Sequence, residues 1–150
     1  IVKAFKIKRK FFHIEFFKIN EFEYIPLEIN ARPPGGPIID MMNYSIDDDL
    51  YAYYANMIIN TLKSPSFDIR YKTKKYYCAY IGRKDKNYKH NDYEIKQYLR
   101  NNLMESDTNP PIFWEAMGKY KYIYRTKDLN ELHTMKNYLL DINIKNNQVA

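Results

Sequence analysis

The sequence predicts an α+β fold in which an antiparallel sheet is flanked by helices. Apolar and polar residues alternate with period two in 13–17 and 27–30, which predicts the two arms of a β-hairpin. Apolar residues recur at helical spacing in 47–63 and 91–104, and again after Asp128. Clusters of proline and glycine separate these segments, so strands and helices are expected to alternate along a chain of 150 residues.

The hairpin concentrates polar side chains on one face. Because side chains alternate along a strand, Glu28 and Asn30 point to the same side. If Ile19 pairs with Tyr24, the register places Glu15 directly opposite Glu28. Two like charges facing each other across a sheet are destabilising. A bound divalent cation is the simplest reason for the arrangement, since Mg²⁺ takes carboxylate oxygens together with substrate phosphates.

The residues after the hairpin predict a stiff loop and then a helix. Prolines and glycines fill 33–37, where a substrate-side or phosphate-side loop is favoured over an ordinary connection. Asp40 is expected to support that loop or to cap the following turn. The aspartates 47–49 suit the positive end of the helix 47–63 better than a metal site, because adjacent helical residues point in different directions.

The second half of the chain predicts a further α+β segment. A break at 64–66 leads to a strand over 75–83 and to the helix 91–104. With no long linker between the halves, residues 1–63 and 64–150 are expected to pack as two lobes of one unit.

A second hairpin and a last helix complete the expected elements. Strands over 112–117 and 121–126 are joined by a turn at Gly118. Asp128 and Glu131 form a variant of the capping box at the start of the last helix, and the tail from 143 to 150 is polar.

Composition excludes several classes of protein. The net charge of +6 and the 16 tyrosines raise the question of nucleic-acid binding, but the positive residues are interspersed with 18 acidic ones, so no nucleic-acid partner is expected. The single cysteine, Cys78, lies in an apolar run and is interpreted as a buried, inert thiol of a reducing compartment. No apolar stretch approaches the ~20 residues of a membrane span, so a cytoplasmic protein without a membrane partner is expected.

One group of residues resembles a known family. Glu15, Glu28 and Asn30 are spaced by thirteen and then two positions, with Arg32 two further on. This pattern resembles the metal-binding hairpin of the ATP-grasp superfamily, which includes biotin carboxylase and the large subunit of carbamoyl-phosphate synthase. The wider strings Phe-Phe-His-Ile-Glu-Phe-Phe and Arg-Pro-Pro-Gly-Gly are similar to one bacterial branch, and the strong part of the match covers about residues 1–60.

The resemblance implies a reaction and a role for each residue. Glu15, Glu28 and Asn30 would hold Mg²⁺ (or Mn²⁺) bridging the phosphates of ATP. Arg32 would be the catalytic residue, stabilising the transferred phosphoryl group or the acyl phosphate. The substrates would be ATP and a small carboxylate or bicarbonate, with an amine or another nucleophile displacing the phosphate.

The sequence also departs from the family. It has only four glycines and no glycine-rich phosphate loop, and it begins at Ile1. We therefore expect the C-terminal portion of an ATP-grasp fold, taken from a larger ligase and inactive without the missing N-terminal ATP-grasp region as its partner. A homodimer is compatible with this expectation.

Two alternatives stay open at this point. One alternative to the ligase is a structural or assembly domain without its own activity. The other is a paired-carboxylate hydrolase with Glu15 as acid and Glu28 as base or nucleophile. The hydrolase gives Asn30 and Arg32 no joint role. His13 shares the face of Glu15 and is interpreted as a packed or hydrogen-bonded neighbour, since other zinc-type ligands are lacking.

Overall fold

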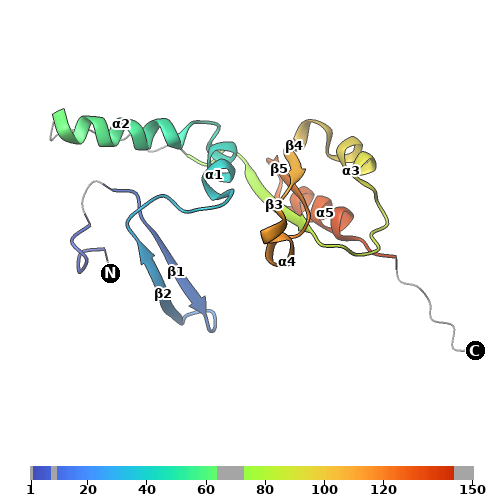
Figure 1. Cartoon of the computed structure of the whole chain (residues 1–150), viewed down its shortest axis with the longest axis horizontal. Coiled ribbons are helices and arrows are strands. Elements are labelled where there is room, and N and C mark those ends of the chain that lie inside the picture. The colour runs from blue at the N-terminus through green and yellow to red at the C-terminus, as the bar shows by residue number, and fades with distance from the viewer. Residues whose placement is uncertain (1, 8–9, 64–72, 144–150) are drawn as a thin grey trace, which may run out of the picture. The chain divides into compact units, whose positions relative to one another are not determined.

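The computed structural model describes residues 2–7, 10–63 and 73–143. Its described part is α+β, as predicted, with two antiparallel sheets and five α-helices (Figure 1). The chain forms two compact units, one made of Ile1–Asn43 and Asp48–Lys72, the other of Tyr44–Asp47 and Thr73–Ala150. The expected break at 64–66, and the expected tail beyond 143, lie outside the described residues.

The first unit contains a two-stranded hairpin and most of two helices. Strand β1 (His13–Lys18) pairs antiparallel with β2 (Tyr24–Asn30). Helix α1 (Ile38–Ile46) starts in this unit, and α2 (Leu50–Lys63) follows it. The sequence did not predict α1 as a helix, because its apolar run is short and follows directly on the proline-rich loop.

The hairpin turn differs by one residue from the predicted one. Tyr24 pairs with Lys18 and not with Ile19, whose backbone N–H donates to the carbonyl of Glu23 at 3.0 Å. The side chain of Asn20 accepts hydrogen bonds from two backbone N–H groups of the turn, which fixes this tighter geometry. The predicted pairing at Ile19 is therefore wrong, although the register further along the strands is not.

The start of α2 explains the run of three aspartates only in part. The helix begins at Leu50, and the Asp49 carboxylate accepts from the backbone N–H groups of Tyr51 and Ala52 at 2.9 and 3.1 Å. Asp47 instead belongs to the second unit, where its carboxylate lies 3.0 Å from the Arg125 guanidinium. The predicted role at the N-terminal end of the helix is therefore confirmed for Asp49 and wrong for Asp47.

The second unit is a three-stranded sheet with helices on one face. Its strands β3 (Tyr77–Arg83), β4 (Leu103–Thr108) and β5 (Tyr120–Thr126) lie in the order β3-β5-β4, with both pairs antiparallel. Strands β3 and β4 are therefore parallel to each other on either side of β5, and α3 (Asp92–Leu99) connects them. Short α4 (Trp114–Met117) precedes β5, and α5 (Leu129–Leu140) follows it.

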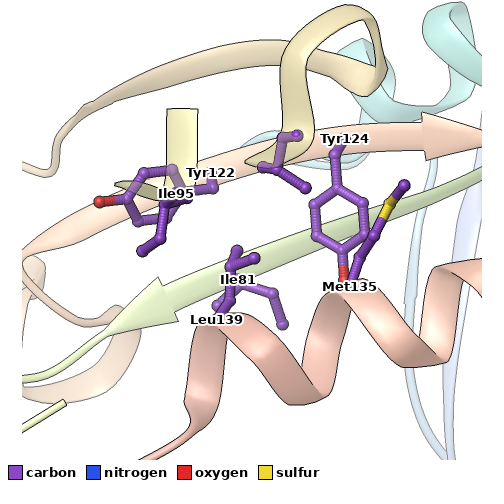
Figure 2. Packing of buried hydrophobic residues seen from close by; sticks show 7 residues of the cluster. Ile81, Ile95, Tyr122, Tyr124, Met135 and Leu139 are labelled. Atoms are coloured by element: carbon purple, nitrogen blue, oxygen red, sulfur yellow. The ribbon is translucent and has the colours of Figure 1, made fainter. Parts of the chain in front are cut away.

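The core of this unit lies between the sheet and the helices α3 and α5. Figure 2 shows Tyr122 and Tyr124 of β5 with Ile81 of β3, facing Met135 and Leu139 of α5. Because the side chains of a strand alternate between its faces, the two tyrosines project from the same side of β5. The remaining buried members of the cluster are Ile95 and Leu99, both from α3.

Two predicted elements of the second unit are wrong. The helix expected over 91–104 ends at Leu99, and 103–108 form β4. The strand expected over 112–117 is a 3₁₀ turn followed by α4. Pro111 opens that turn, as proline often does at the first position of a helix. The indole N–H of Trp114 donates to the carbonyl of Asn109 at 2.6 Å, and this bond stabilises the turn. The expected hairpin around Gly118 is consequently absent, and β5 pairs with β3 and β4 instead.

Helix caps in the second unit follow the sequence more closely. The Asp128 side chain caps α5 by accepting from the backbone N–H of Asn130. Glu131 does not close a capping box, because its carboxylate accepts from the Thr126 hydroxyl. The reciprocal capping box forms at α3 instead, between Asn91 and Glu94.

A close backbone approach fixes the end of β3. A Cβ added to Gly82 would lie 1.6 Å from the carbonyl oxygen of Met117, so no larger residue fits. Gly118, at φ +84°, turns the chain back, and the Lys119 N–H donates to the carbonyl of Arg83 at 2.8 Å. Arg83 is thereby held at a defined place at the edge of the sheet.

Candidate metal-binding hairpin

The hairpin brings the predicted acidic pair together. Glu15 lies directly opposite Glu28, and His13 lies opposite Asn30. The register shifts by one residue between positions 15 and 16 of β1, because β2 carries the extra residue Leu27 in a bulge there. The bulge connects this register with the tighter one near the turn. The predicted cross-strand position of the two glutamates is confirmed.

Side-chain contacts link the four polar residues of this face, which we call the hairpin quartet (His13, Glu15, Glu28, Asn30). The amide nitrogen of Asn30 donates to a carboxylate oxygen of Glu28 and lies 3.0 Å from Nε2 of His13. Nε2 of His13 is in turn 3.7 Å from the nearer carboxylate oxygen of Glu15. The amide and the imidazole therefore connect the two carboxylates through a series of side-chain contacts.

The protonation of His13 determines which contact is favourable. When the proton is on Nδ1, Nε2 accepts from the Asn30 amide; when both nitrogens carry protons, Nε2 pairs with the Glu15 carboxylate. Nδ1 is enclosed and has no hydrogen-bond partner among the residues that the structure describes. The His13 side chain is 18% exposed, whereas that of Glu15 is 52% exposed. The histidine thus packs at the base of the quartet, as the sequence suggested, and the carboxylates reach into solvent.

Arg32 is not drawn into the quartet. Its guanidinium donates to the carbonyl of Pro33 at 3.1 Å, and the residue is exposed. The loop that follows is open, since a Cβ at Gly35 or Gly36 would meet nothing within 4 Å. Gly36 adopts φ +61°, which favours glycine at that position. Arg32 and the two glycines of the loop are therefore all exposed to solvent.

Asp40 makes a contact that the sequence did not predict. It lies in the first turn of α1, and its carboxylate accepts from the Tyr51 hydroxyl at 3.0 Å. This bond ties the start of α1 to α2. Asp40 therefore contributes to the fold of the first unit.

The donor set of the quartet suits a hard cation. In 2–7, 10–63 and 73–143 no three histidine, cysteine, aspartate or glutamate side chains cluster as a ready metal site. The hairpin offers two exposed carboxylates and one amide oxygen, which are the hard oxygen ligands that Mg²⁺ prefers. To contribute its oxygen, Asn30 needs a half-turn of its planar amide, because its nitrogen now faces Glu28. The residues present therefore fit Mg²⁺ chemically.

The structure also shows where two arginines at strand ends lie. Arg125 forms an ion pair with Asp47. Arg83 is only 6% exposed and lies at the wall of a cleft in the second unit, which the sequence did not predict. The signal in the sequence was the run of lysines directly after β3, at 84, 86 and 89. Cys78 is half-buried, and burial raises the pKa of its thiol to about 11, so a reactive thiolate is disfavoured there.

Comparison with models of protein families and with curated proteins finds no match to this chain. Among the helices that the structure describes, none is long and apolar enough to cross a membrane. The functional argument therefore rests on the side chains themselves.

Proposed function

We propose that the chain is the C-terminal part of an ATP-grasp ligase, of the carbamoyl-phosphate-synthase-like or biotin-carboxylase-like kind, and that its hairpin holds the Mg²⁺ of Mg-ATP. The observation that carries the proposal is the exposed cross-strand pair of Glu15 and Glu28 with Asn30 on the same face. An enzyme of this kind would act in the cytoplasm. Its remaining nucleotide-binding residues would come from outside this chain.

Each residue has a part that follows from its chemistry. Glu15 and Glu28 would bind the cation through carboxylate oxygens, and Asn30 would add an oxygen without a third negative charge. When bound, Mg²⁺ would neutralise the charge of the ATP phosphates. Arg32, in the open space beside the glycine loop, would orient the transferred phosphoryl group and stabilise its developing charge. His13 would hold the Asn30 amide in position.

The exposure of the two glutamates argues against a paired-carboxylate hydrolase. Such an enzyme needs one carboxyl group kept protonated by an apolar environment. Glu15 and Glu28 are both exposed to solvent, so neither lies in such an environment. A purely structural domain remains the second candidate, because it requires no ligand at the hairpin, and the experiment below separates it from the ligase.

The proposal is tested by adding Mn²⁺ to the isotope-labelled chain and following paramagnetic broadening of backbone amide signals by NMR. Broadening should be strongest at 13–15 and 28–30. Glu28→Gln should weaken Mn²⁺ binding about tenfold or more, since an oxygen ligand loses its charge (about 1.4 kcal/mol per tenfold). The matched control is Glu21→Gln, in the exposed turn of the same hairpin, which should leave binding unchanged.

Two outcomes would contradict this assignment. One is broadening spread evenly over the acidic residues of the chain, and the other is equal loss of affinity in Glu21→Gln and Glu28→Gln. In the complete ligase, Glu28→Gln should abolish Mg-ATP turnover with the fold intact. Arg32→Ala should there lower kcat more than it raises KM, and a change in KM alone would remove Arg32 from the catalytic role.

A further inference from the structure

A cleft of about 680 Å³ opens in the second unit where β3 ends and α3 begins. One wall is the connection 84–91 together with the first turn of α3, and the other is the end of β4 (106–108) with Tyr120 and Tyr122 of β5. We call it the β3–α3 cleft. Its volume falls within the range of sites that bind small molecules.

Arg83 forms part of the cleft wall as a buried charge. One terminal nitrogen of its guanidinium donates to the carbonyl of His90 at 2.7 Å, and the group lies over the ring of Tyr88, 3.9 Å from its centroid. In the part of the chain that the structure describes, no carboxylate lies within 4 Å of it. Its Nε atom is likewise enclosed without a hydrogen-bond partner there. Buried charges in proteins are ordinarily paired with an opposite charge, whereas this arginine has no such partner among the described residues.

The acidic residue beside Arg83 is already engaged. The Asp92 carboxylate accepts from the Lys96 ammonium at 2.7 Å and from the Tyr122 hydroxyl at 2.8 Å. Burial opposes the ionisation of Asp92, but these hydrogen bonds outweigh it and lower its pKa. Asp92 is therefore matched to Lys96, and its charge offsets that of Arg83 only from a distance.

Two lysines of the connection add unmatched positive charge. Lys84 and Lys86 both line the cleft, and neither forms an ion pair within the described residues. The cleft wall carries four cationic side chains against three acidic ones, so an excess of positive charge remains. The cationic residues are Arg83, Lys84, Lys86 and Lys96, and the acidic ones are Asp85, Asp92 and Asp107.

The connection that carries these lysines is held in place by the end of α5. The backbone N–H of Lys89 donates to the carbonyl of Asp141 at 2.9 Å, and the side chains of the same two residues form an ion pair at 3.0 Å. The N–H of Asn143 donates to the carbonyl of Asn87, also at 2.9 Å. Together with the Arg83 bond to His90, these contacts fix the connection at several points. A ligand would therefore find the lysines on an ordered frame, with less entropy to lose on binding.

We propose that the β3–α3 cleft binds a small phosphorylated molecule whose phosphate supplies the missing counter-ion. Lys84 and Lys86 contact the phosphate, and Arg83 acts on it through its buried charge. A phosphate group has three acceptor oxygens and a charge of nearly −2, whereas a carboxylate has two oxygens and a charge of −1. The phosphate therefore matches the two ammonium groups and the guanidinium better. The hydroxyls of Ser106 and Thr108 and the ring of Tyr120 line the opposite wall for the rest of the ligand. This site is separate from the hairpin and does not depend on the proposed function.

The test is an NMR titration of the whole 150-residue chain with adenosine monophosphate, in the presence of a metal chelator so that the hairpin is not involved. Adenosine, which lacks the phosphate, is the matched ligand control. Signals of 84–92 and 106–108 should shift with the monophosphate and not with adenosine. The double variant with Lys84→Ala and Lys86→Ala should weaken binding by about a hundredfold, at roughly tenfold for each charged contact. Lys136→Ala, an exposed lysine of α5 outside the cleft, should bind as the unchanged chain does.

Several results would overturn the proposal. They are equal shifts with adenosine, shifts that avoid 84–92 and 106–108, and a loss of affinity in Lys136→Ala equal to that of the double variant. Inorganic phosphate serves as a second probe, since it should shift the signals of 84–86 and compete with the monophosphate. Failure of this titration leaves the Mn²⁺ experiment untouched, because that experiment reads the hairpin and this one excludes metal.

Discussion

The two units of this protein differ in how they bury apolar surface. Among its described residues, the second unit encloses a cluster of seven buried side chains between a three-stranded sheet and two helices, and five of them are at 1% exposure or less. The hairpin of the first unit exposes large apolar side chains on both faces, up to 88% at Phe22. Three strands packed on helices form a stable core, whereas a two-stranded hairpin has little stability of its own in water. Order in the hairpin therefore depends on the pairing of its strands and on the contacts of its turn more than on burial.

The largest expected difference between the units concerns core truncation. Leu139→Ala should lower the free energy of unfolding of the second unit by about 2–5 kcal/mol, because a fully buried leucine leaves a cavity. Phe17→Ala in the hairpin, where the side chain is 55% exposed, should change it by no more than about 0.5 kcal/mol. Urea unfolding of each variant, followed by circular dichroism, measures both values. A large effect of Phe17→Ala would show that the hairpin face is covered in solution, and the comparison would fail.

Alkaline pH should destabilise the second unit. Burial raises the pKa of Tyr124 to about 12, and burial with the hydrogen bond to Asp92 raises that of Tyr122 to about 12. Burial raises the pKa of Cys78 to about 11. These pKa values lie above those of the same groups in the unfolded chain, so the folded state is favoured while the three groups are neutral. Their contribution to the free energy of unfolding is therefore complete below about pH 9 and is lost as the pH rises toward 12.

The measurement is the urea midpoint of the second unit at pH 8, 10 and 11. It should fall steadily over this range, and Cys78→Ala should remove part of the fall between pH 9 and 11. A midpoint independent of pH would mean that the two tyrosines reach solvent in the folded state. The result therefore checks the enclosure of the core directly.

The smallest expected effect concerns the helix caps. Asp128→Ala removes the side-chain acceptor for the Asn130 N–H and should cost the second unit about 1 kcal/mol. Asp49→Ala removes the corresponding acceptor at α2 in the first unit, and should reduce helix content there while leaving the unfolding midpoint of the second unit unchanged. Circular dichroism and urea unfolding of the two variants give these quantities. Equal shifts of that midpoint would show that the units unfold together.

The sequence located the hairpin pair well because strand alternation is a local property. Glu15 falls opposite Glu28 even though the turn is one residue tighter than predicted, since the bulge near Leu27 compensates for the shift. The role of Arg32 could not be read in the same way, because a side chain in an open loop takes its position from whatever binds beside it. The burial of Arg83 could not be read from local patterns either. Its burial depends on Tyr88 and His90, which the connection after β3 folds back over it.

By itself the sequence determined the α+β class, the hairpin with its quartet, strand β5, and helix α5 with its Asp128 cap. Each of these is encoded in patterns of a few neighbouring residues. The tertiary structure alone decided that polar 103–108 form β4, because β5 offers a free edge whose hydrogen bonds must be satisfied. It also decided that 112–117 form a 3₁₀ turn and the short helix α4, where the carbonyl of Met117 lies close against Gly82 of β3. Local patterns set the elements, and hydrogen-bond pairing and packing between distant segments set how the ambiguous stretches fold.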